Sequence, residues 1–285
     1  MATRKKQSPL RAAFQGEPGA FSHKAAMDLL GAGVTVVPRQ HFEDVFAALR
    51  DGEADAAVIP IENTLHGSVH ENYDHLLQYD FRIVAETNVR IVHNLIAVPG
   101  VRFKDVQRAF SHPVALNQCV NFFKSNPRIQ RESFYDTAGS VKMVMAEGLR
   151  DAAAIASAVS AEIYGANILK RSIEDDRKNF TRFFLLRRAD QPSLALNEQG
   201  KNGWKTSLVF TVRNQPGTLF KALSAFALRD LSVIKIESRP LHGRPWEYLF
   251  YLDFLGNTEE ERVQRALSHL QELAEMLRVL GCYRV

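Results

Sequence analysis

Residues 56–68 read AAVIPIENTLHGS, and this stretch indicates the fold class of the first part of the chain. Residues 56–61 are an almost uninterrupted apolar run, which is typical of a strand buried on both faces of a parallel sheet. The polar residues 62–68 are expected to form a loop directly after that strand, and a helical pattern then continues to residue 77. This order predicts an α/β architecture, in which ligands bind beyond the carboxyl ends of the strands.

The alternation of strand and helix extends over a first block, residues 11–188. Helices are expected from residues 22, 113 and 138, and a further helix ends at residue 165. Other strands are expected at residues 12–15, 82–98, 109–110, 131–135, 152–156 and 180–186. Strands that alternate with helices in this way predict a doubly wound α/β domain.

A second block, residues 205–285, follows a polar linker at residues 189–204 that contains Pro192, Gly200 and Gly203. Its pattern is strand, helix, strand, strand, helix, strand, which is the ferredoxin-like βαββαβ plan. The strands are expected at residues 207–212, 232–239, 247–254 and 277–285, and the helices at residues 218–229 and 258–276. Thr258 and Glu261 have the spacing of a capping box at the start of the last helix.

The composition is that of an ordinary globular protein, with 285 residues, 46% hydrophobic, 24% charged and a formal net charge of +4. Much of this charge comes from Arg4, Lys5 and Lys6, which we interpret as a solvated tail and not as a nucleic-acid-binding segment. No apolar run is long enough to span a membrane, and residues 1–10 lack the apolar core of a secretion signal. The two cysteines are far apart in sequence, and Cys119 is interpreted as a half-buried structural thiol. We therefore expect a cytoplasmic protein with no membrane or nucleic-acid partner.

Polar stretches occur where strands are expected to meet helices. Residues 16–22, GEPGAFS, lead into a helix N-terminus whose free N–H groups favour an anion, although an ordinary Gly-Pro turn fits equally well. Ser111 precedes Pro113 and is interpreted as the N-cap of the helix that carries Gln118. Residues 136–140, DTAGS, form a further turn of the same kind. These stretches are candidate ligand-binding loops.

Residues 175–183, DDRKNFTRF, bring polar groups to the start of an otherwise apolar strand. In an extended strand, Thr181 and Phe183 share one face and Arg182 takes the other. A hydroxyl, a guanidinium and an aromatic ring in this position suggest a binding site.

A metal site is the alternative interpretation, because His66, His70 and His75 lie close in sequence to Glu62 and Glu71. The HExxH pattern of zinc proteases is absent, and a glycine after the first histidine weakens the helix that a two-histidine site would need. We therefore expect no metal site.

Taken together and in this order, the stretches resemble prephenate dehydratase over residues 11–285. The matching segments are FQGEPGAFS (14–22), PIENTLHGS (60–68), SHPVALNQC (111–119), DTAGS (136–140), AAIAS (153–157), NFTRF (179–183), NQPGTLF (214–220) and IESRP (236–240). The resemblance implies a catalytic domain of two α/β lobes, like the type II periplasmic binding proteins, followed by an ACT domain. Some relatives carry a fused chorismate mutase domain, for which there is no room before Leu10, so we expect a monofunctional enzyme. Two positions depart from the family pattern: Val114 replaces a common glutamine, and GTLF at 217–220 replaces GALV.

The resemblance implies particular site residues. Catalytic roles fall on Asn63, Ser111, Gln118 and Thr181, and substrate-binding positions beside them are Glu62, Thr64, Arg182 and Phe183. The implied reaction removes the ring carboxylate of prephenate as CO2 and its ring hydroxyl as water, giving phenylpyruvate for phenylalanine biosynthesis. Aromatisation supplies the driving force, so no cofactor is expected. Thr181 would donate a hydrogen bond to the leaving oxygen.

The resemblance further implies feedback by L-phenylalanine at the ACT domain of a homodimer or homotetramer. The implied binding residues are Asn214, Pro216, Gly217, Thr218, Leu219, Phe220, Glu237 and Ser238. Two alternatives remain open at this point. Residues 149–165 are similar to the arogenate dehydratases, which would make phenylalanine directly from arogenate, and a non-catalytic amino-acid sensor would use the same two domains.

Overall fold

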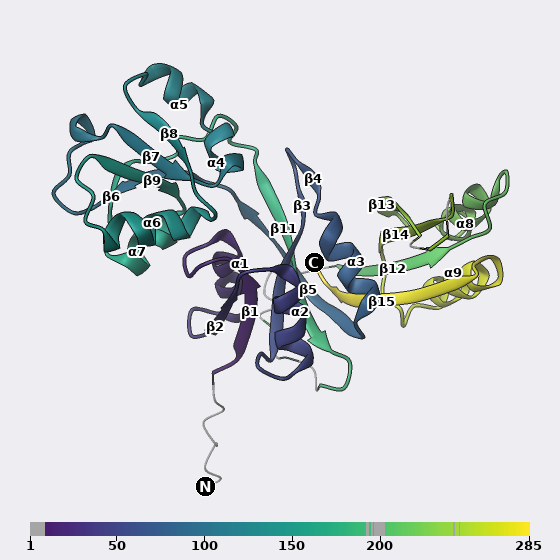
Figure 1. The fold of residues 1–285 in the computed structure, drawn as a ribbon. Helices are drawn as coiled ribbons and strands as arrows, with labels where there is room; N and C mark the ends of the chain where they lie inside the picture. The colour runs from purple at the N-terminus through teal and green to yellow at the C-terminus, as the bar shows by residue number, and fades with distance from the viewer. Residues whose placement is uncertain (1–8, 192–193, 195, 197–202, 242, 245) are drawn as a thin grey trace, which may run out of the picture. The chain divides into compact units, whose positions relative to one another are not determined.

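The computed structural model describes residues 9–191, 194, 196, 203–241, 243–244 and 246–285 (Figure 1). The chain forms two compact units. The first comprises residues up to Tyr79 together with Thr87–Arg188, and the second comprises Asp80–Glu86 together with Ala189–Val285. The basic segment at residues 4–6 and most of the expected linker lie outside the described residues.

The first unit has two lobes, each built on one sheet. The sheet of the first lobe has the strand order β2-β1-β3-β11-β5, with β4 paired to β3. Strands β1, β2 and β3 pair in parallel, whereas β11 runs antiparallel to β3. Its elements are β1 (Arg11–Gln15), α1 (Phe21–Leu30), β2 (Thr35–Arg39), α2 (Phe42–Arg50), β3 (Ala56–Asn63), β4 (Gly67–Ser68), α3 (His70–Gln78), β5 (Phe81–Arg90) and β11 (Phe180–Arg188).

The second lobe contains a sheet of order β10-β6-β9-β7-β8. Strand β9 lies at its centre and reads AAAIA; Ala153 and Ile155 pack into one hydrophobic cluster, and Ala154 and Ala156 pack into another. Both faces of this strand are therefore buried, as its composition predicts. The lobe comprises β6 (Asn94–Ala97), η1 (Phe103–Asp105), β7 (Arg108–Ser111), α4 (Pro113–Asn117), α5 (Val120–Ser125), β8 (Gln130–Ser133), α6 (Thr137–Ala146), β9 (Ala152–Ala156), α7 (Ala158–Tyr164) and β10 (Asn167–Lys170).

Several strand boundaries differ from the sequence-based prediction. Strand β3 continues through Glu62 and Asn63, because Gly67–Ser68 folds back and pairs with it. The expected single strand at 82–98 is two strands, and β10 was not anticipated. Strand β2 was also missed; it contains Pro38, which a sheet tolerates at an edge, and β2 is an edge strand.

The second unit has the predicted βαββαβ order. Its elements are β12 (Trp204–Thr211), α8 (Thr218–Ala227), β13 (Val233–Pro240), β14 (Tyr248–Leu255), α9 (Glu261–Leu273) and β15 (Met276–Arg284). The four strands form an antiparallel sheet of order β13-β14-β12-β15. Both helices pack on one face of this sheet, in a core that includes Phe210, Phe226, Phe254 and Leu270.

The expected capping box at Thr258 and Glu261 is wrong. Helix α9 begins at Glu261 after the N-cap Glu260, whose carboxylate accepts a hydrogen bond from the backbone N–H of Asn257 (2.8 Å). The helix also ends at Leu273, before β15 begins at Met276. Among the described residues, no helix is both long enough and apolar enough to cross a membrane.

Candidate active site

Asn63 and Thr181 meet at the ends of two paired strands. They are directly opposite each other in the antiparallel pair of β3 and β11. Asn63 Nδ2 lies 2.9 Å from Thr181 Oγ1 and 2.7 Å from Asn179 Oδ1. Thr181 is 9% exposed, so its hydroxyl is largely shielded from solvent. Polar groups from two segments far apart in the sequence are thus gathered at one place.

The orientation of the Asn63 amide determines what the Thr181 hydroxyl can do. Asn63 Oδ1 accepts hydrogen bonds from the backbone N–H groups of Leu65 (3.0 Å) and His66 (3.1 Å). The amide nitrogen therefore faces β11, and an amide nitrogen only donates. Thr181 Oγ1 must accept this hydrogen bond, which leaves the hydroxyl proton of Thr181 free to be donated to another group.

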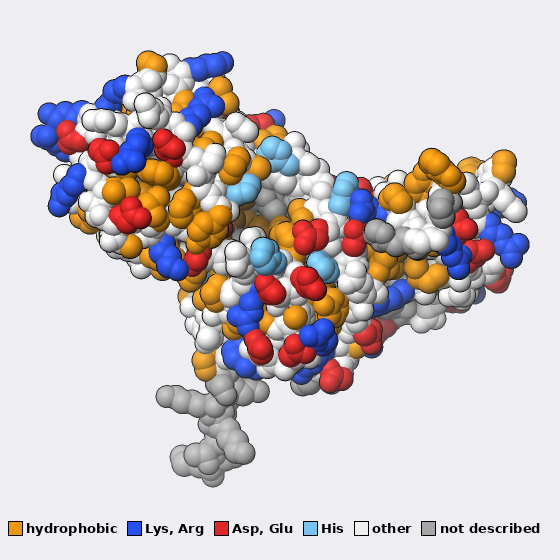
Figure 2. Space-filling view, in the orientation of Figure 1, with side chains coloured by type: hydrophobic (Ala, Val, Ile, Leu, Met, Phe, Trp, Pro, Cys, Tyr) orange, Lys and Arg blue, Asp and Glu red, His pale blue; other side chains and the backbone are white. Residues whose placement is uncertain are grey.

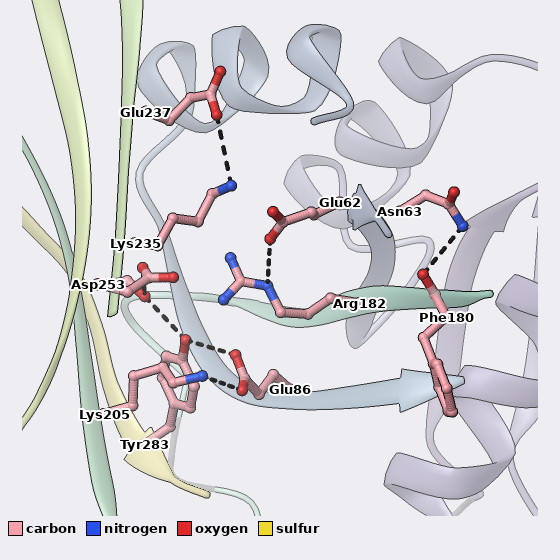
Figure 3. A network of polar contacts seen from close by, with 11 residues as sticks. Glu62, Asn63, Glu86, Phe180, Arg182, Lys205, Lys235, Glu237, Asp253 and Tyr283 are labelled. Carbon is pink, nitrogen blue, oxygen red and sulfur yellow. Dashed lines mark hydrogen bonds and ion pairs between the residues drawn. The ribbon is translucent and has the colours of Figure 1, made fainter. Parts of the chain in front are cut away.

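Thr64 holds the segment that leads into β11. Its hydroxyl donates to the carbonyl of Lys178 (3.0 Å) and accepts from the backbone N–H of Phe180 (3.0 Å). Asn63 Nδ2 also lies 3.1 Å from the carbonyl oxygen of Phe180 (Figure 3). The side chain of Thr64 is thus occupied by the backbone on both sides of Asn179, and it fixes the loop that positions Thr181.

Gln118 lies between two histidines. It is the C-cap residue of α4 in the second lobe. Its Oε1 is 2.7 Å from Nε2 of the buried His93, and its Nε2 is 2.9 Å from Nε2 of His66. His66 belongs to the β3–β4 turn of the first lobe, so this contact links the two lobes. Figure 2 shows several histidine side chains, in pale blue, around a hollow on the face that it draws.

The prediction that Ser111 is an N-cap is wrong. The N-cap residue of α4 is His112, whose ring accepts from the backbone N–H of Val114 (3.3 Å). Ser111 is the last residue of β7, is completely buried, and donates its hydroxyl to the carbonyl of Ile155 in β9 (2.6 Å). Its side chain therefore joins two strands of the second lobe.

Glu62 and Arg182 are also opposite each other, one position along from Asn63 and Thr181. Arg182 Nε lies 3.6 Å from Glu62 Oε2 (Figure 3), and the guanidinium is 5.1 Å from the ring centre of Phe184. Because successive side chains of a strand point to opposite faces, these groups lie on the face away from Thr181. The structure does not bring Arg182 into the cluster of Asn63 and Thr181.

Phe183 follows a register shift in β11, between Arg182 and Phe183. Its ring is 2% exposed and belongs to the hydrophobic core. The expected apolar slot is therefore not lined by an accessible Phe183.

Sequence reasoning missed three buried polar residues next to the site, namely Asn179, Glu174 and His93. Asn179 is 1% exposed, and within the described chain its Nδ2 has no hydrogen-bond partner. Glu174 accepts from Arg90 (2.9 Å) and from the backbone N–H of His93 (3.0 Å). Asn179 lies inside a stretch that the sequence had marked as unusual, whereas the only signal for His93 was a lone histidine among apolar residues.

The GEPGAFS stretch leads into α1 as expected, beside a cavity of about 330 Å³. The cavity lies at the carboxyl ends of β1 and β2 and is lined in part by Gln15, Glu17, Arg39 and Asp136. Asp136 is the N-cap of α6 and accepts from the backbone N–H of Gly139 (2.7 Å), and burial raises the pKa of its carboxyl group.

The cysteine and the histidines that were considered as nucleophile or metal ligands contact other parts of the protein. Cys119 is completely buried, more than the half-buried thiol expected, and burial raises the pKa of its thiol. His66 contacts Gln118. The ring centres of His75 and Phe46 are 4.9 Å apart in a tilted arrangement, and His75 lies 3.6 Å from Glu71. In the part of the chain that the structure describes, no three histidine, cysteine, aspartate or glutamate side chains are grouped so as to hold a metal ion.

Most of the expected effector-binding residues lie around the start of α8, whereas Glu237 and Ser238 lie on β13. Gly217 is the N-cap, with φ +80°, and no side chain caps the helix. Asn214 Nδ2 donates to the carbonyl of Trp246 (3.0 Å), and the Thr218 hydroxyl donates to the carbonyl of Gln215 (2.8 Å). The first turn of α8 therefore starts with an uncapped helix end, which favours a negatively charged group.

The apolar and strand residues of this set differ in exposure. Leu219 packs against the core of the unit, whereas Phe220 is 76% exposed. On β13, Glu237 is 3.6 Å from Lys235 (Figure 3), and Ser238 is exposed. Phe220 is thus the accessible apolar group of the set.

The fold and the site define a two-lobed α/β enzyme domain joined to a βαββαβ regulatory domain. A family model described as "Prephenate dehydratase" matches residues 12–191, and one described as "ACT domain" matches residues 206–274. The chain belongs to the prephenate dehydratase family and carries an ACT domain.

Similar proteins support this assignment. "Arogenate dehydratase/prephenate dehydratase 1, chloroplastic" of Arabidopsis thaliana is 43% identical, over 97% of this chain and 72% of that protein. "Arogenate dehydratase 2" of Petunia hybrida is also 43% identical, with the same coverage. The prephenate dehydratase of Arthrobacter aurescens, solved in complex with L-Phe, has a TM-score of 0.84 and 31% identity over 96% of this chain and 90% of that one. A structure described as "GqqA- a novel type of quorum quenching acylases" has a TM-score of 0.86 and 34% identity over 96% and 98%.

The expectation of a cytoplasmic protein is contradicted by these comparisons. Four of the most similar relatives, all from Arabidopsis thaliana, are named chloroplastic. The expectation rested on the missing apolar core of a secretion signal. Plastid transit peptides have no such core, so this observation does not distinguish the two compartments.

Proposed function

We propose that this enzyme converts prephenate to phenylpyruvate, with its catalytic domain at residues 11–188, a linker at 189–204 and the regulatory domain at 205–285. Family membership supports the reaction type. The single observation that carries the mechanism is the hydrogen bond from Asn63 Nδ2 to Thr181 Oγ1. It leaves the hydroxyl proton of Thr181 available for the oxygen that departs from the substrate ring.

The reaction is a coupled loss of two groups. The C–C bond to the ring carboxylate breaks, CO2 leaves, and the electron pair of that bond moves into the ring. The ring C–O bond breaks, and the oxygen leaves with its electron pair as hydroxide, which a proton converts to water. Negative charge therefore develops on the departing oxygen in the transition state, and a donor held in advance at that position lowers the barrier.

Thr181 acts as a hydrogen-bond donor and not as a general acid. A threonine hydroxyl is too weak an acid to be tuned to neutral pH. The low exposure of Thr181 favours this role, because a hydrogen bond to a developing charge is stronger where water is excluded. Gln118 is the second group that we assign to the substrate, as a donor to one of its oxygens.

The other expected residues support the site from a distance. Thr64 holds the backbone beside Asn179, and Ser111 joins β7 to β9. Glu62 and Arg182 pair on the face of the strands away from Thr181. In this proposal these four residues position the elements that carry Asn63, Gln118 and Thr181.

Arogenate is the second candidate substrate. Several relatives at 42–44% identity are named arogenate dehydratases, and this observation favours arogenate. Arogenate has an amino group where prephenate has the keto group of its side chain. The ring chemistry is the same, so the roles of Thr181 and Asn63 are the same for either substrate.

We further propose that L-phenylalanine binds at the start of α8 and inhibits the enzyme as a homodimer or homotetramer. The uncapped helix end suits the effector carboxylate, and the exposed Phe220 suits its benzyl group. Edge strand β13 exposes Ile234 (45%) and Ile236 (41%), and pairing with a second copy would cover this edge. The complex of the related enzyme with L-Phe supports the choice of ligand.

The test of the catalytic proposal is to replace Thr181 in two ways. Thr181→Ala removes the donor and should lower kcat by about a hundredfold, whereas Thr181→Ser keeps a hydroxyl and should lower it much less. Release of phenylpyruvate measures the rate, and thermal unfolding checks that both variants fold. Equal rates for the alanine and serine variants would remove the hydroxyl from the mechanism.

A further inference from the structure

The buried side chain of His93 contacts Gln118 of the candidate site. It is 1% exposed, and its Nε2 lies 2.7 Å from Gln118 Oε1. The backbone N–H of His93 donates to Glu174 (3.0 Å), and its ring packs edge-on against Phe21 at 5.7 Å. The imidazole is therefore held firmly by its surroundings, next to a group that we assign to the substrate.

The protonation of His93 follows from its burial. Burial lowers the pKa of His93, although Gln118 and Glu174 act in the opposite direction, so the ring is neutral near neutral pH. A neutral imidazole has one N–H and one lone pair. Its Nδ1 is buried and has no hydrogen-bond partner among the residues that the structure describes. The position of the single proton then determines how the Gln118 amide must point.

Two arrangements of the pair are compatible with the distances. In the first, His93 Nε2–H donates to Gln118 Oε1, and only a lone pair of His93 Nδ1 is unsatisfied. In the second, the amide is reversed and donates to His93 Nε2, which places the proton on Nδ1 as a buried donor without an acceptor. Buried donors without acceptors are rarer in proteins than unsatisfied acceptors, so the first arrangement is favoured.

The first arrangement directs the amide N–H groups of Gln118 towards His66 of the first lobe. His66 Nε2 lies 2.9 Å from Gln118 Nε2 and accepts this hydrogen bond. The backbone N–H of His66 donates to Asn63 Oδ1 (3.1 Å), so His66 stands between the two halves of the site. His66 is exposed, and a substrate oxygen can take its place on the amide. The reversed amide would instead turn an oxygen towards a substrate that carries two carboxylates.

We propose that His93 is a positioning residue that fixes the Gln118 amide as a hydrogen-bond donor on the side of His66, which accepts this hydrogen bond until a substrate oxygen replaces it. The proposal rests on the proposed function, because it gives the Gln118 donor an anionic substrate to bind. His93 itself does not contact substrate. Its effect on the reaction is transmitted entirely by the orientation of Gln118.

The first test is spectroscopic and needs no turnover. In the substrate-free protein labelled with ¹⁵N-histidine, the two ring nitrogens report the tautomer, and loss of a signal in His93→Gln assigns it to His93. The expected form is the neutral Nε2–H tautomer. The matched control His66→Ala should leave that tautomer unchanged, because Nδ1 of His93 still lacks an acceptor. An Nδ1–H tautomer or a charged ring at neutral pH would overturn the proposal.

The second test is kinetic and separates positioning from a general effect on structure. His93→Leu should lower kcat/KM roughly ten- to a hundredfold, as expected for a misplaced binding group. His93→Gln, whose amide nitrogen can replace Nε2–H, should recover most of that loss. In a Gln118→Ala background, His93→Leu should have almost no additional effect, since the group that it positions is gone. If the two effects multiply, or if His93→Gln is no better than His93→Leu, the proposal is wrong.

These outcomes are distinguishable from a failure of the proposed function. If the wild-type protein turns over neither prephenate nor arogenate, the reaction assignment is wrong. The tautomer measurement then still decides whether His93 orients Gln118.

Discussion

At the residue scale, the direction of one amide defines the chemistry of its neighbour. The oxygen of Asn63 is engaged by two backbone N–H groups, so only its nitrogen can face Thr181. Because Asn63 Nδ2 donates a hydrogen bond to the Thr181 oxygen, the hydroxyl proton of Thr181 remains available for the substrate. The role of Thr181 is therefore specified by Asn63 as much as by Thr181 itself.

Asn63→Asp tests this dependence with almost no change of shape. One carboxylate oxygen keeps the contacts with the backbone of Leu65 and His66. The other oxygen accepts a hydrogen bond from the Thr181 hydroxyl, which can then no longer donate to the substrate. We therefore expect kcat to fall by about a hundredfold, as for loss of a transition-state donor. Steady-state kinetics measure the loss, and circular dichroism checks the fold. A folded variant with kcat within a few fold of wild type would contradict this role of Asn63.

Sequence reasoning found this pair of residues but not its geometry. Asn63 and Thr181 were selected because their stretches resemble a family, and 118 positions separate them in the chain. His93 and Asn179 were missed because a single buried polar residue has no periodic signature. Ser111 was misassigned because a serine before proline has the local pattern of an N-cap, and its strand contact with Ile155 depends on tertiary structure.

At the element scale, strand β5 continues across the boundary between the two units. Residues 80–86 belong to the second unit, and residues from Thr87 onward belong to the first. In the second unit, Glu86 forms a buried ion pair with Lys205 and accepts from the Tyr283 hydroxyl (3.2 Å) (Figure 3). The sequence predicted an extended segment here. The alternation of apolar and polar residues along it could not show that its first part belongs to one unit and its second part to the other.

Gly281 of β15 tests the packing of this strand. A Cβ at position 281 would overlap the backbone carbonyl of Ile83, which cannot move as a flexible side chain can. Gly281→Ala should therefore destabilise the second unit by roughly 1–3 kcal/mol or more. Gly203→Ala is the matched control, because its nearest neighbour is 3.6 Å away. Thermal unfolding compares the two variants, and equal melting temperatures would contradict the close contact.

The boundaries of elements were harder to predict than their order. The order of the βαββαβ unit follows from alternating apolar residues, a local property. The start of α9 depends instead on Glu260 bonding to Asn257, which the Thr-x-x-Glu pattern did not reveal. Strand β3 was predicted to end where its apolar run ends, but pairing with β4 extends it to Asn63.

At the scale of the whole molecule, the dehydratase domain and the ACT domain are expected to bind different ligands, the substrate and the effector. The family assignment joins a dehydratase domain to an ACT domain, and inhibition requires that phenylalanine bind the less active state more tightly. A coupling of about 1–3 kcal/mol is usual for such effects. The resemblance of the sequence predicted this pairing of domains, whereas local patterns carry no information about the assembly of subunits.

Phe220→Ala tests the effector site without affecting the core, because this side chain is 76% exposed. It should weaken phenylalanine binding about tenfold or more, since the apolar contact with the benzyl group is lost. Leu228→Ala is the matched control, because Leu228 follows the other end of α8 and is 75% exposed. Calorimetric titration of each protein with phenylalanine gives the affinities. Equal affinities for both variants would place the effector elsewhere.

The most direct measurement for the central claim is turnover of both candidate substrates by the purified protein. With prephenate, we expect phenylpyruvate and CO2 in equal amounts, and a kcat/KM greater than for conversion of arogenate to phenylalanine. A greater kcat/KM for arogenate would contradict the choice of substrate while retaining the reaction. If neither compound reacts and phenylalanine still binds, the protein is an amino-acid sensor and the proposed catalytic function is wrong.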